Sequence, residues 1–131
     1  MKFGYTILYV SDVEASLSFY EKAFGFARRF ITPEKDYGEL ESGETTIAFA
    51  SLELGQSNFS QGFKPSQPSQ EPFGVELALV TENIEVDFKR ALEAGAVEFE
   101  PLATKPWGQQ VGYVRDNNGF LIEICTPVQV G

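Results

Sequence analysis

The residue types that this chain lacks limit the chemistry it could perform. Its 131 residues include no histidine and a single cysteine, Cys125. A cysteine nucleophile usually needs a basic partner, so Cys125 is expected to be a small buried hydrophobe in the last strand. The glycines match neither P-loop nor dinucleotide-binding spacing, so no nucleotide cofactor is expected. Carboxylates and aromatic rings remain as the groups that could carry a function.

One set of candidate binding residues is aromatic. Phe59 and Phe63 occur in residues 55–72, a stretch rich in Gly, Ser, Gln and Pro that is typical of a loop. Trp107 is the only tryptophan, and Gln109 follows two residues later. The three rings could stack on a planar or cationic ligand while Gln109 hydrogen bonds to it. The alternatives are an inert linker and a tryptophan that packs only for stability.

These residues belong to a chain that contains one structural unit twice. Each copy has a short apolar run, a polar break, an amphipathic stretch of about three turns and a glycine that ends it. Strands are expected at residues 5–10, 26–31, 37–40, 45–52, 75–80, 97–99, 109–115 and 120–126. Helices are expected from the caps Asp12 and Asn83 to Gly25 and Gly95. The pattern predicts an α+β fold of two tandem βαβββ modules, residues 1–54 and 73–128, joined by the loop 55–72 in a single domain, 1–131.

Composition and charge restrict the expected partners. The hydrophobic and charged fractions, 43% and 22%, are typical of a folded soluble protein. The apolar runs are far shorter than the ~20 residues that cross a bilayer, and no signal-peptide pattern follows Met1, so a cytoplasmic protein is expected. The net charge of −9 repels nucleic acids and anionic lipids and attracts cationic small molecules.

Two groups of motifs connect this chain to a known family. The first module contains L8-Y-V-S-D-V and S16-L-S-F-Y-E-K-A-F-G-F, and the second contains Y113-V-R-D-N-N-G-F-L-I-E-I. With the paired modules, they resemble the vicinal oxygen chelate superfamily, which includes glyoxalase I, the bleomycin-resistance proteins, fosfomycin-resistance enzymes and extradiol dioxygenases. The resemblance implies a curved mixed sheet with an open cup that commonly binds a divalent metal, and a homodimer.

The resemblance also assigns the family's metal-ligand positions to residues of this chain. They fall on Tyr5, Ala48, Glu76 and Glu123, where the family usually has histidine, glutamate, histidine and glutamate. Only Glu123 keeps the usual ligand and Ala48 has no donor atom, so the resemblance implies no transition metal here. The alternative is a weak Mg or Mn site with oxygen ligands from Glu76, Glu123 and Tyr5.

Strand alternation supports an inward position for the two glutamates. Glu123 alternates with Ile122 and Ile124, and Glu76 precedes the apolar run L77-A-L-V, so the apolar residues can pack beneath the sheet. If the two carboxyl groups converge without a metal, repulsion and desolvation raise the pKa of at least one of them. A bound amine or guanidinium would relieve that repulsion. The alternative is ordinary surface charge on an exposed sheet face.

These observations lead to one functional expectation and one alternative. We expect a small-molecule binding protein of the glyoxalase/bleomycin-resistance type that sequesters a cationic or aromatic ligand without a transition metal. Glu76 and Glu123 would supply its chemistry, including any acid–base catalysis. Ligand contacts are expected from Tyr5, Trp107, Phe59, Phe63 and Gln109. The alternative is a metal-dependent lyase or dioxygenase, similar to lactoylglutathione lyase, with a nonstandard oxygen-ligand site.

Overall fold

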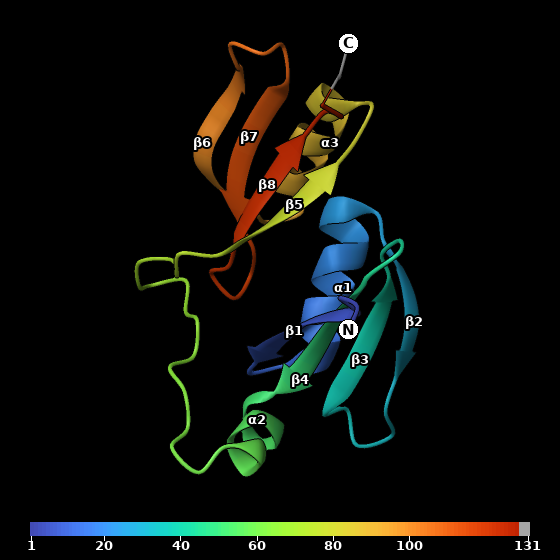
Figure 1. Ribbon diagram of the computed structural model, residues 1–131, viewed down its shortest axis with the longest axis vertical. Helices are drawn as coiled ribbons and strands as arrows, with labels where there is room; N and C mark the ends of the chain where they lie inside the picture. The colour runs from blue at the N-terminus through green and yellow to red at the C-terminus, as the bar shows by residue number, and fades with distance from the viewer. Residues whose placement is uncertain (129–131) are drawn as a thin grey trace. The chain divides into compact units, whose positions relative to one another are not determined.

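The computed structural model describes residues 1–128, and the chain divides into two compact units, Met1–Ser66 and Gln67–Gly131 (Figure 1). The last three residues of the expected domain, 129–131, lie outside the described part. The first unit contains β1 (Tyr5–Val10), α1 (Val13–Phe24), β2 (Ala27–Ile31), β3 (Tyr37–Glu41), β4 (Thr46–Ser51) and α2 (Leu52–Asn58). The second contains β5 (Glu76–Val80), α3 (Ile84–Glu93), β6 (Val97–Thr104), β7 (Gln110–Arg115) and β8 (Leu121–Cys125). The predicted α+β fold of two tandem βαβββ modules is therefore confirmed.

The two units have the same strand topology. Their four-stranded sheets have the orders β1-β4-β3-β2 and β5-β8-β7-β6. The first and last strands of each module pair in parallel, and the remaining neighbours pair antiparallel. Each sheet is mixed and open, and neither closes into a barrel. A position in one sheet therefore has a counterpart in the other that can be found from the register.

The two long helices begin and end close to where the sequence predicts. Asp12 caps α1 by accepting a hydrogen bond from the Ala15 amide at 2.9 Å, and Gly25 ends it with a left-handed φ of 79°. The side chains of α1 that are buried against the first sheet include Leu17 and Tyr20. Helix α3 buries Ile84, Phe88 and Ala91 in the same way. The apolar stripe of each helix thus covers one face of its own sheet.

A glycine on the third strand of each module allows this close packing. A side chain at Gly38 of β3 would place its Cβ 2.6 Å from the Leu17 side chain of α1. A side chain at Gly112 of β7 would place its Cβ 2.7 Å from the Phe88 ring of α3. Both distances are well below van der Waals contact, so each helix inserts one large side chain at a position where the sheet has only a backbone.

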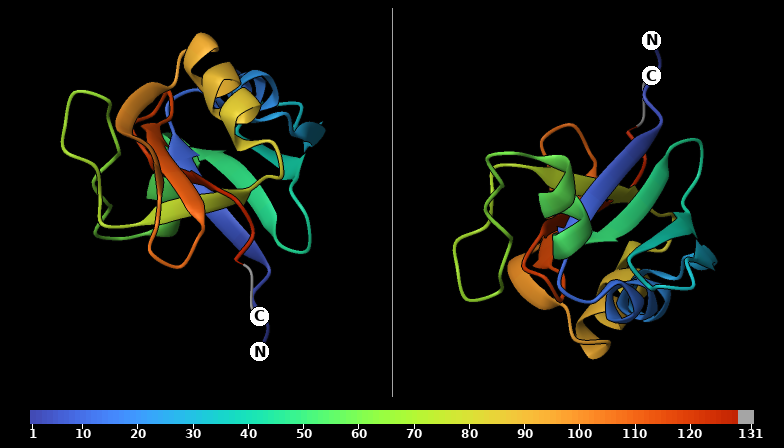
Figure 2. Two further views of the ribbon diagram at one scale, coloured as in Figure 1. Left: turned by 90° about the horizontal axis from the view of Figure 1, so that it is seen from above. Right: turned by 90° about the horizontal axis from the view of Figure 1, so that it is seen from below.

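Helix α2 corrects the prediction that residues 55–72 form only a loop. In Figure 1 and in the two further views of Figure 2, α2 (green) follows directly from β4. Ser51 caps it by accepting a hydrogen bond from the Leu54 amide at 3.1 Å, and Gly55 packs against the Tyr9 and Phe63 rings. This tertiary packing outweighs the weak helix propensity of a segment rich in Gly, Ser and Asn. Residues 59–75 contain no helix or strand.

Strand β6 is longer than the predicted 97–99. It continues to Thr104 because Pro101 falls within the register shift between Glu100 and Ala103, and β6 is an edge strand where a missing amide donor is tolerated. Among the described residues, no helix has the length and apolar character needed to span a bilayer.

Candidate functional site

The candidate site lies on the second sheet, on the face opposite α3. Alternation along β8 buries Ile122 and Ile124, which are 0% and 3% exposed, on the side of α3. Glu123 consequently points to the opposite face, and its cross-strand partner on β7 is Tyr113. Glu76 begins the neighbouring strand β5 and is exposed. The two glutamates are thus brought together on the face that strand alternation predicts for them.

The carboxyl group of Glu76 lies close enough to Glu123 for the two groups to interact. Desolvation raises the pKa of Glu76, and the hydrogen bond and negative charge of Glu123 raise it further. The folded protein therefore favours the protonated form of Glu76 more than an isolated, solvated carboxyl group would.

Tyr113 orients Glu123 within this pair. Its hydroxyl group donates a hydrogen bond to Glu123 Oε1 at 2.9 Å. Burial, followed by the hydrogen bond and charge of Glu123, raises the pKa of Tyr113 to about 12. The phenol therefore remains a donor at neutral pH and does not act as a base.

Cys125 and Gln109 extend the polar contacts from Glu123 toward Trp107. Burial and the neighbouring Glu123 raise the pKa of Cys125 to about 11, and Gln109 partly opposes this shift. Gln109 accepts a hydrogen bond from the Trp107 indole at 2.8 Å and donates one to the Thr126 carbonyl at 2.8 Å. Cys125 is buried, as expected, and its protonated thiol makes it a poor nucleophile. Trp107 is 62% exposed and lines a small hollow of about 140 Å³.

Arg115, a basic residue of β7 on the same face as Glu123, makes its hydrogen bonds to the backbone. Arg115 stands in register with Leu121, which pairs with Glu76 on its other side. Its guanidinium group donates hydrogen bonds to three backbone carbonyls, those of Gly119 at 3.0 Å, Pro68 at 3.1 Å and Gln67 at 3.2 Å. These bonds attach the start of the second unit to the β7–β8 turn rather than neutralise the glutamates.

Phe59 and Phe63 belong to the first unit, where both contact Tyr9. Their ring centroids lie 6.0 Å and 4.9 Å from that of Tyr9, and 6.2 Å from each other. The three rings form one aromatic cluster beside α2. The predicted ligand-binding wall that would combine these two phenylalanines with Trp107 stays a prediction, because the described ring contacts lie within the first unit.

Tyr5 and Ala48, at the other two family ligand positions, lie on the first sheet. Tyr5 is 57% exposed and close enough to Tyr37 to contribute to its raised pKa, although burial and the contact with Glu39 contribute more. Ala48 is fully buried between Ile7 and Glu39 in the sheet register. Neither residue completes a ligand set: among the described residues, no group of three or more His, Cys, Asp or Glu side chains could hold a metal.

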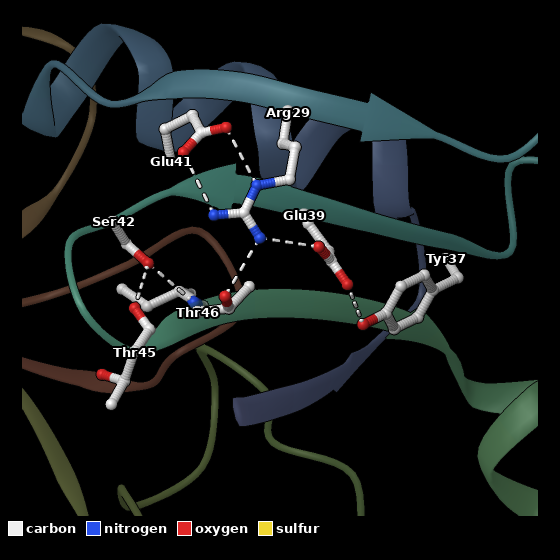
Figure 3. A network of polar contacts seen from close by, with 8 residues as sticks. Arg29, Tyr37, Glu39, Glu41, Ser42, Thr45 and Thr46 are labelled. Atoms are coloured by element: carbon white, nitrogen blue, oxygen red, sulfur yellow. Dashed lines mark hydrogen bonds and ion pairs between the residues drawn. The ribbon is translucent and has the colours of Figure 1, made fainter. Parts of the chain in front are cut away.

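A network on the first sheet was not predicted from the sequence. Figure 3 shows the Arg29 guanidinium group of β2 between two carboxylates of β3. It donates to Glu41 at 2.9 Å and 3.1 Å, to Glu39 at 2.9 Å and to the Thr46 hydroxyl at 3.0 Å. Tyr37 donates to the second oxygen of Glu39 at 2.7 Å. These contacts keep Arg29 charged and lower the pKa of Glu41.

The fold and the site together define a class of protein. Two tandem βαβββ modules, each with one open mixed sheet and polar groups on the face away from its long helix, are the architecture of the glyoxalase-like proteins. The chain belongs to the Glyoxalase/Bleomycin resistance protein/Dioxygenase superfamily, whose family model matches residues 2–124.

Solved structures agree with this assignment at the level of the fold. A glyoxalase-related enzyme from Fulvimarina pelagi is 23% identical, with a TM-score of 0.81 over 97% of this chain and 88% of that one. TioX from Micromonospora sp. ML1 is 19% identical, with a TM-score of 0.72 over 96% and 98%. A glyoxalase/bleomycin resistance protein/dioxygenase family enzyme from Burkholderia phytofirmans PsJN is 18% identical, with a TM-score of 0.74 over 98% and 100%. No curated protein matches the chain.

Proposed function

We propose that this chain is a small-molecule binding protein that sequesters a cationic aromatic ligand at Glu76 and Glu123, without a transition metal. The observation that carries the proposal is the carboxyl pair itself. Both groups lie on one sheet face, Glu123 raises the pKa of Glu76, and no basic side chain of the described residues contributes to that pKa. A bound cation would offset the negative charge of Glu123 that raises the pKa of Glu76.

The aromatic part of the ligand would be contacted by Trp107. Gln109 fixes the indole through its N–H group, while most of the ring remains exposed. Gln109 also contacts Cys125, which in turn contacts Glu123, so one chain of polar contacts connects the ring to the carboxyl pair. A cation with an attached aromatic ring could contact both ends of this chain.

The donor set supports sequestration rather than metal-dependent turnover. Of the four family ligand positions, only Glu76 and Glu123 carry carboxylates, and Ala48 carries no donor. The metal-dependent alternative is tested directly by titrating the protein with Mn²⁺, Ni²⁺ and Zn²⁺ in a calorimeter. We expect no stoichiometric, tight binding. A tight site that disappears in Glu123→Gln would replace the binding proposal with a metal-dependent enzyme.

The proposal is tested by ligand titration with matched probes. 1-Naphthylmethylammonium provides a cationic aromatic probe, 1-naphthalenemethanol a neutral one and 1-naphthoate an anionic one. We expect the cation to bind best and to quench Trp107 fluorescence. Glu123→Gln should weaken the cation by about 1–3 kcal/mol and leave the neutral probe nearly unchanged.

The control variant is Glu85→Gln, which removes an exposed carboxylate from α3, the helix on the opposite side of the same sheet. It should bind the cation as the parent protein does. Preference for the anionic probe, or equal cation binding by Glu123→Gln, would show that the carboxyl pair is not the recognition site.

A further inference from the structure

The second unit begins with a segment that lies outside its sheet. Residues 67–75, here called the strap, contain no helix or strand and precede Glu76, the first residue of β5. The strap is yellow-green in Figure 1, where it passes the β7–β8 turn on its way to β5. Residues 67–71 are all exposed, so burial of side chains does not hold this part of the chain in place.

Arg115 holds the start of the strap against the β7–β8 turn. Each nitrogen of its guanidinium group donates to one backbone carbonyl: Nε to Gly119 in the turn at 3.0 Å, and Nη1 and Nη2 to Pro68 and Gln67 in the strap at 3.1 Å and 3.2 Å. A guanidinium group presents its N–H donors in a rigid planar fork, so one side chain can reach all three carbonyls. Arg115 thus joins the turn to residues that lie 47 and 48 positions away in the sequence.

The strap also packs directly on the turn at Gly119. This glycine has a left-handed φ of 87°, and a Cβ there would lie 2.7 Å from the Gln67 carbonyl carbon and oxygen. The Gln70 amide donates to the same Gln67 carbonyl at 3.1 Å, so the strap turns at this point. The strap therefore rests on bare backbone, at a distance that a side chain at position 119 would prevent.

The strap begins and ends beside one row of residues across the second sheet. Arg115 pairs with Leu121, and Leu121 pairs with Glu76 on its other side. Neighbouring strands lie about 4.8 Å apart, so the backbones of Arg115 and Glu76 are roughly 10 Å apart. The chain from Pro68 to Glu76 could span about 26 Å when extended, so it must loop out between its two ends.

The side chain of Arg115 sets the side of the sheet on which the strap is held. Val114 and Ile122 are fully buried on the side of α3, so their neighbours Arg115 and Leu121 point to the opposite face. This is the face that carries Glu123, here called the binding face. The two strap carbonyls bonded to Arg115 are therefore held on the side of the binding face, at the end where Leu121 lies.

We propose that the strap closes the end of the binding face at Leu121, and that Arg115 is the latch that keeps the strap closed. Both bonds to the strap come from one side chain, so a single movement of Arg115 releases both. The released strap is free to leave the turn and to open the end of the face. The inference goes beyond the proposed function, because it concerns access to this face whichever molecule occupies it.

Hydrogen exchange of the whole protein tests the latch. Arg115→Gln removes the charged fork, and Arg115→Lys keeps the charge but cannot donate to three carbonyls from one plane. We expect amide exchange in residues 67–75 to become about tenfold faster in Arg115→Gln and to change less in Arg115→Lys, with exchange in β5, β7 and β8 as in the parent protein. The control is Lys89→Gln, which removes the same charge from an exposed position of α3 and should exchange as the parent does.

Access to the closed end is measured with a thiol at its centre. Leu121→Cys, combined with Cys125→Ser, gives a protein with one cysteine in the row that the strap is proposed to close. Iodoacetamide is a neutral reagent, so its approach does not depend on the charge of Arg115. Adding Arg115→Gln should increase the labelling rate about tenfold, whereas adding Lys89→Gln should leave it unchanged.

Each measurement can overturn one part of the proposal. Unchanged exchange in residues 67–75 of Arg115→Gln would show that Arg115 is not a latch. Faster exchange with unchanged labelling at position 121 would show that the strap does not close the binding face. If Arg115→Gln loosens the whole sheet, Gly119→Ala takes its place, since the new Cβ displaces Gln67 while the charge of Arg115 is kept. It should speed both exchange and labelling, and values equal to those of the parent would overturn the proposal.

Discussion

Glu76 is a residue whose charge makes the folded chain less stable. Desolvation and the neighbouring Glu123 raise its pKa above the ordinary 4.5, so the folded protein holds this proton at pH values where the unfolded chain has released it. The stability contributed by the protonated form is fully present below the unfolded pKa. It is lost as the pH rises through the raised pKa of the folded state.

Replacing Glu76 with glutamine should therefore stabilise the protein at neutral pH more than in acid. Thermal unfolding at pH 4 and pH 7 measures this difference. We expect the melting temperature of Glu76→Gln relative to the parent to increase between the two pH values, with Glu85→Gln showing no such trend. The opposite trend would mean that the folded state favours the Glu76 carboxylate.

Sequence patterns were informative for residues whose orientation depends on regular alternation. Glu76 and Glu123 stand in strands without a register shift. The alternation of side chains along a strand therefore places them on the face opposite the buried isoleucines. Arg29 was missed because a register shift between Arg28 and Phe30 interrupts that counting. Its partners Glu39 and Glu41 come from another strand, and opposite charges on neighbouring strands were the only signal available.

At the scale of elements, the glycine of β7 determines how closely α3 approaches its sheet. Gly112→Ala would place a Cβ 2.7 Å from the side chains of Phe88 and Leu102, so the helix or the ring must shift. We expect a loss of about 1–3 kcal/mol in the free energy of unfolding. Chemical denaturation followed by circular dichroism measures it.

The matched control is Gly74→Ala in the same unit, where nothing lies within 4 Å of the new Cβ. Its effect should stay within about 0.5 kcal/mol. If both alanine variants unfold alike, the close approach of Phe88 does not contribute to stability.

Elements with strong local signals were predicted well, and elements that depend on packing were not. Helices α1 and α3 have apolar stripes and end near glycines, so their positions agree with the predicted ones. Helix α2 has only seven residues and is held by Tyr9 and Phe63, which its own sequence cannot reveal. The extension of β6 past Pro101 likewise depends on its place at the edge of the sheet.

At the scale of the whole molecule, we propose that the chain forms a homodimer. Each four-stranded sheet is open and has two edge strands, and such edges favour association with another chain. Light scattering coupled to size exclusion should give twice the mass of the chain. The mass should persist in high salt, where repulsion between chains of net charge −9 is screened. A single-chain mass at both salt concentrations would contradict the proposal.

The position of Cys125 has a practical consequence for following the site. It is the only cysteine of the chain, it is 3% exposed, and its thiol contacts Glu123. An alkylating reagent can therefore reach the thiol only after this part of the sheet opens. The rate of modification thus measures how often that opening occurs, without an introduced label. A ligand that binds both Glu76 and Glu123 would slow the modification, so ligand binding can be followed through the native cysteine alone.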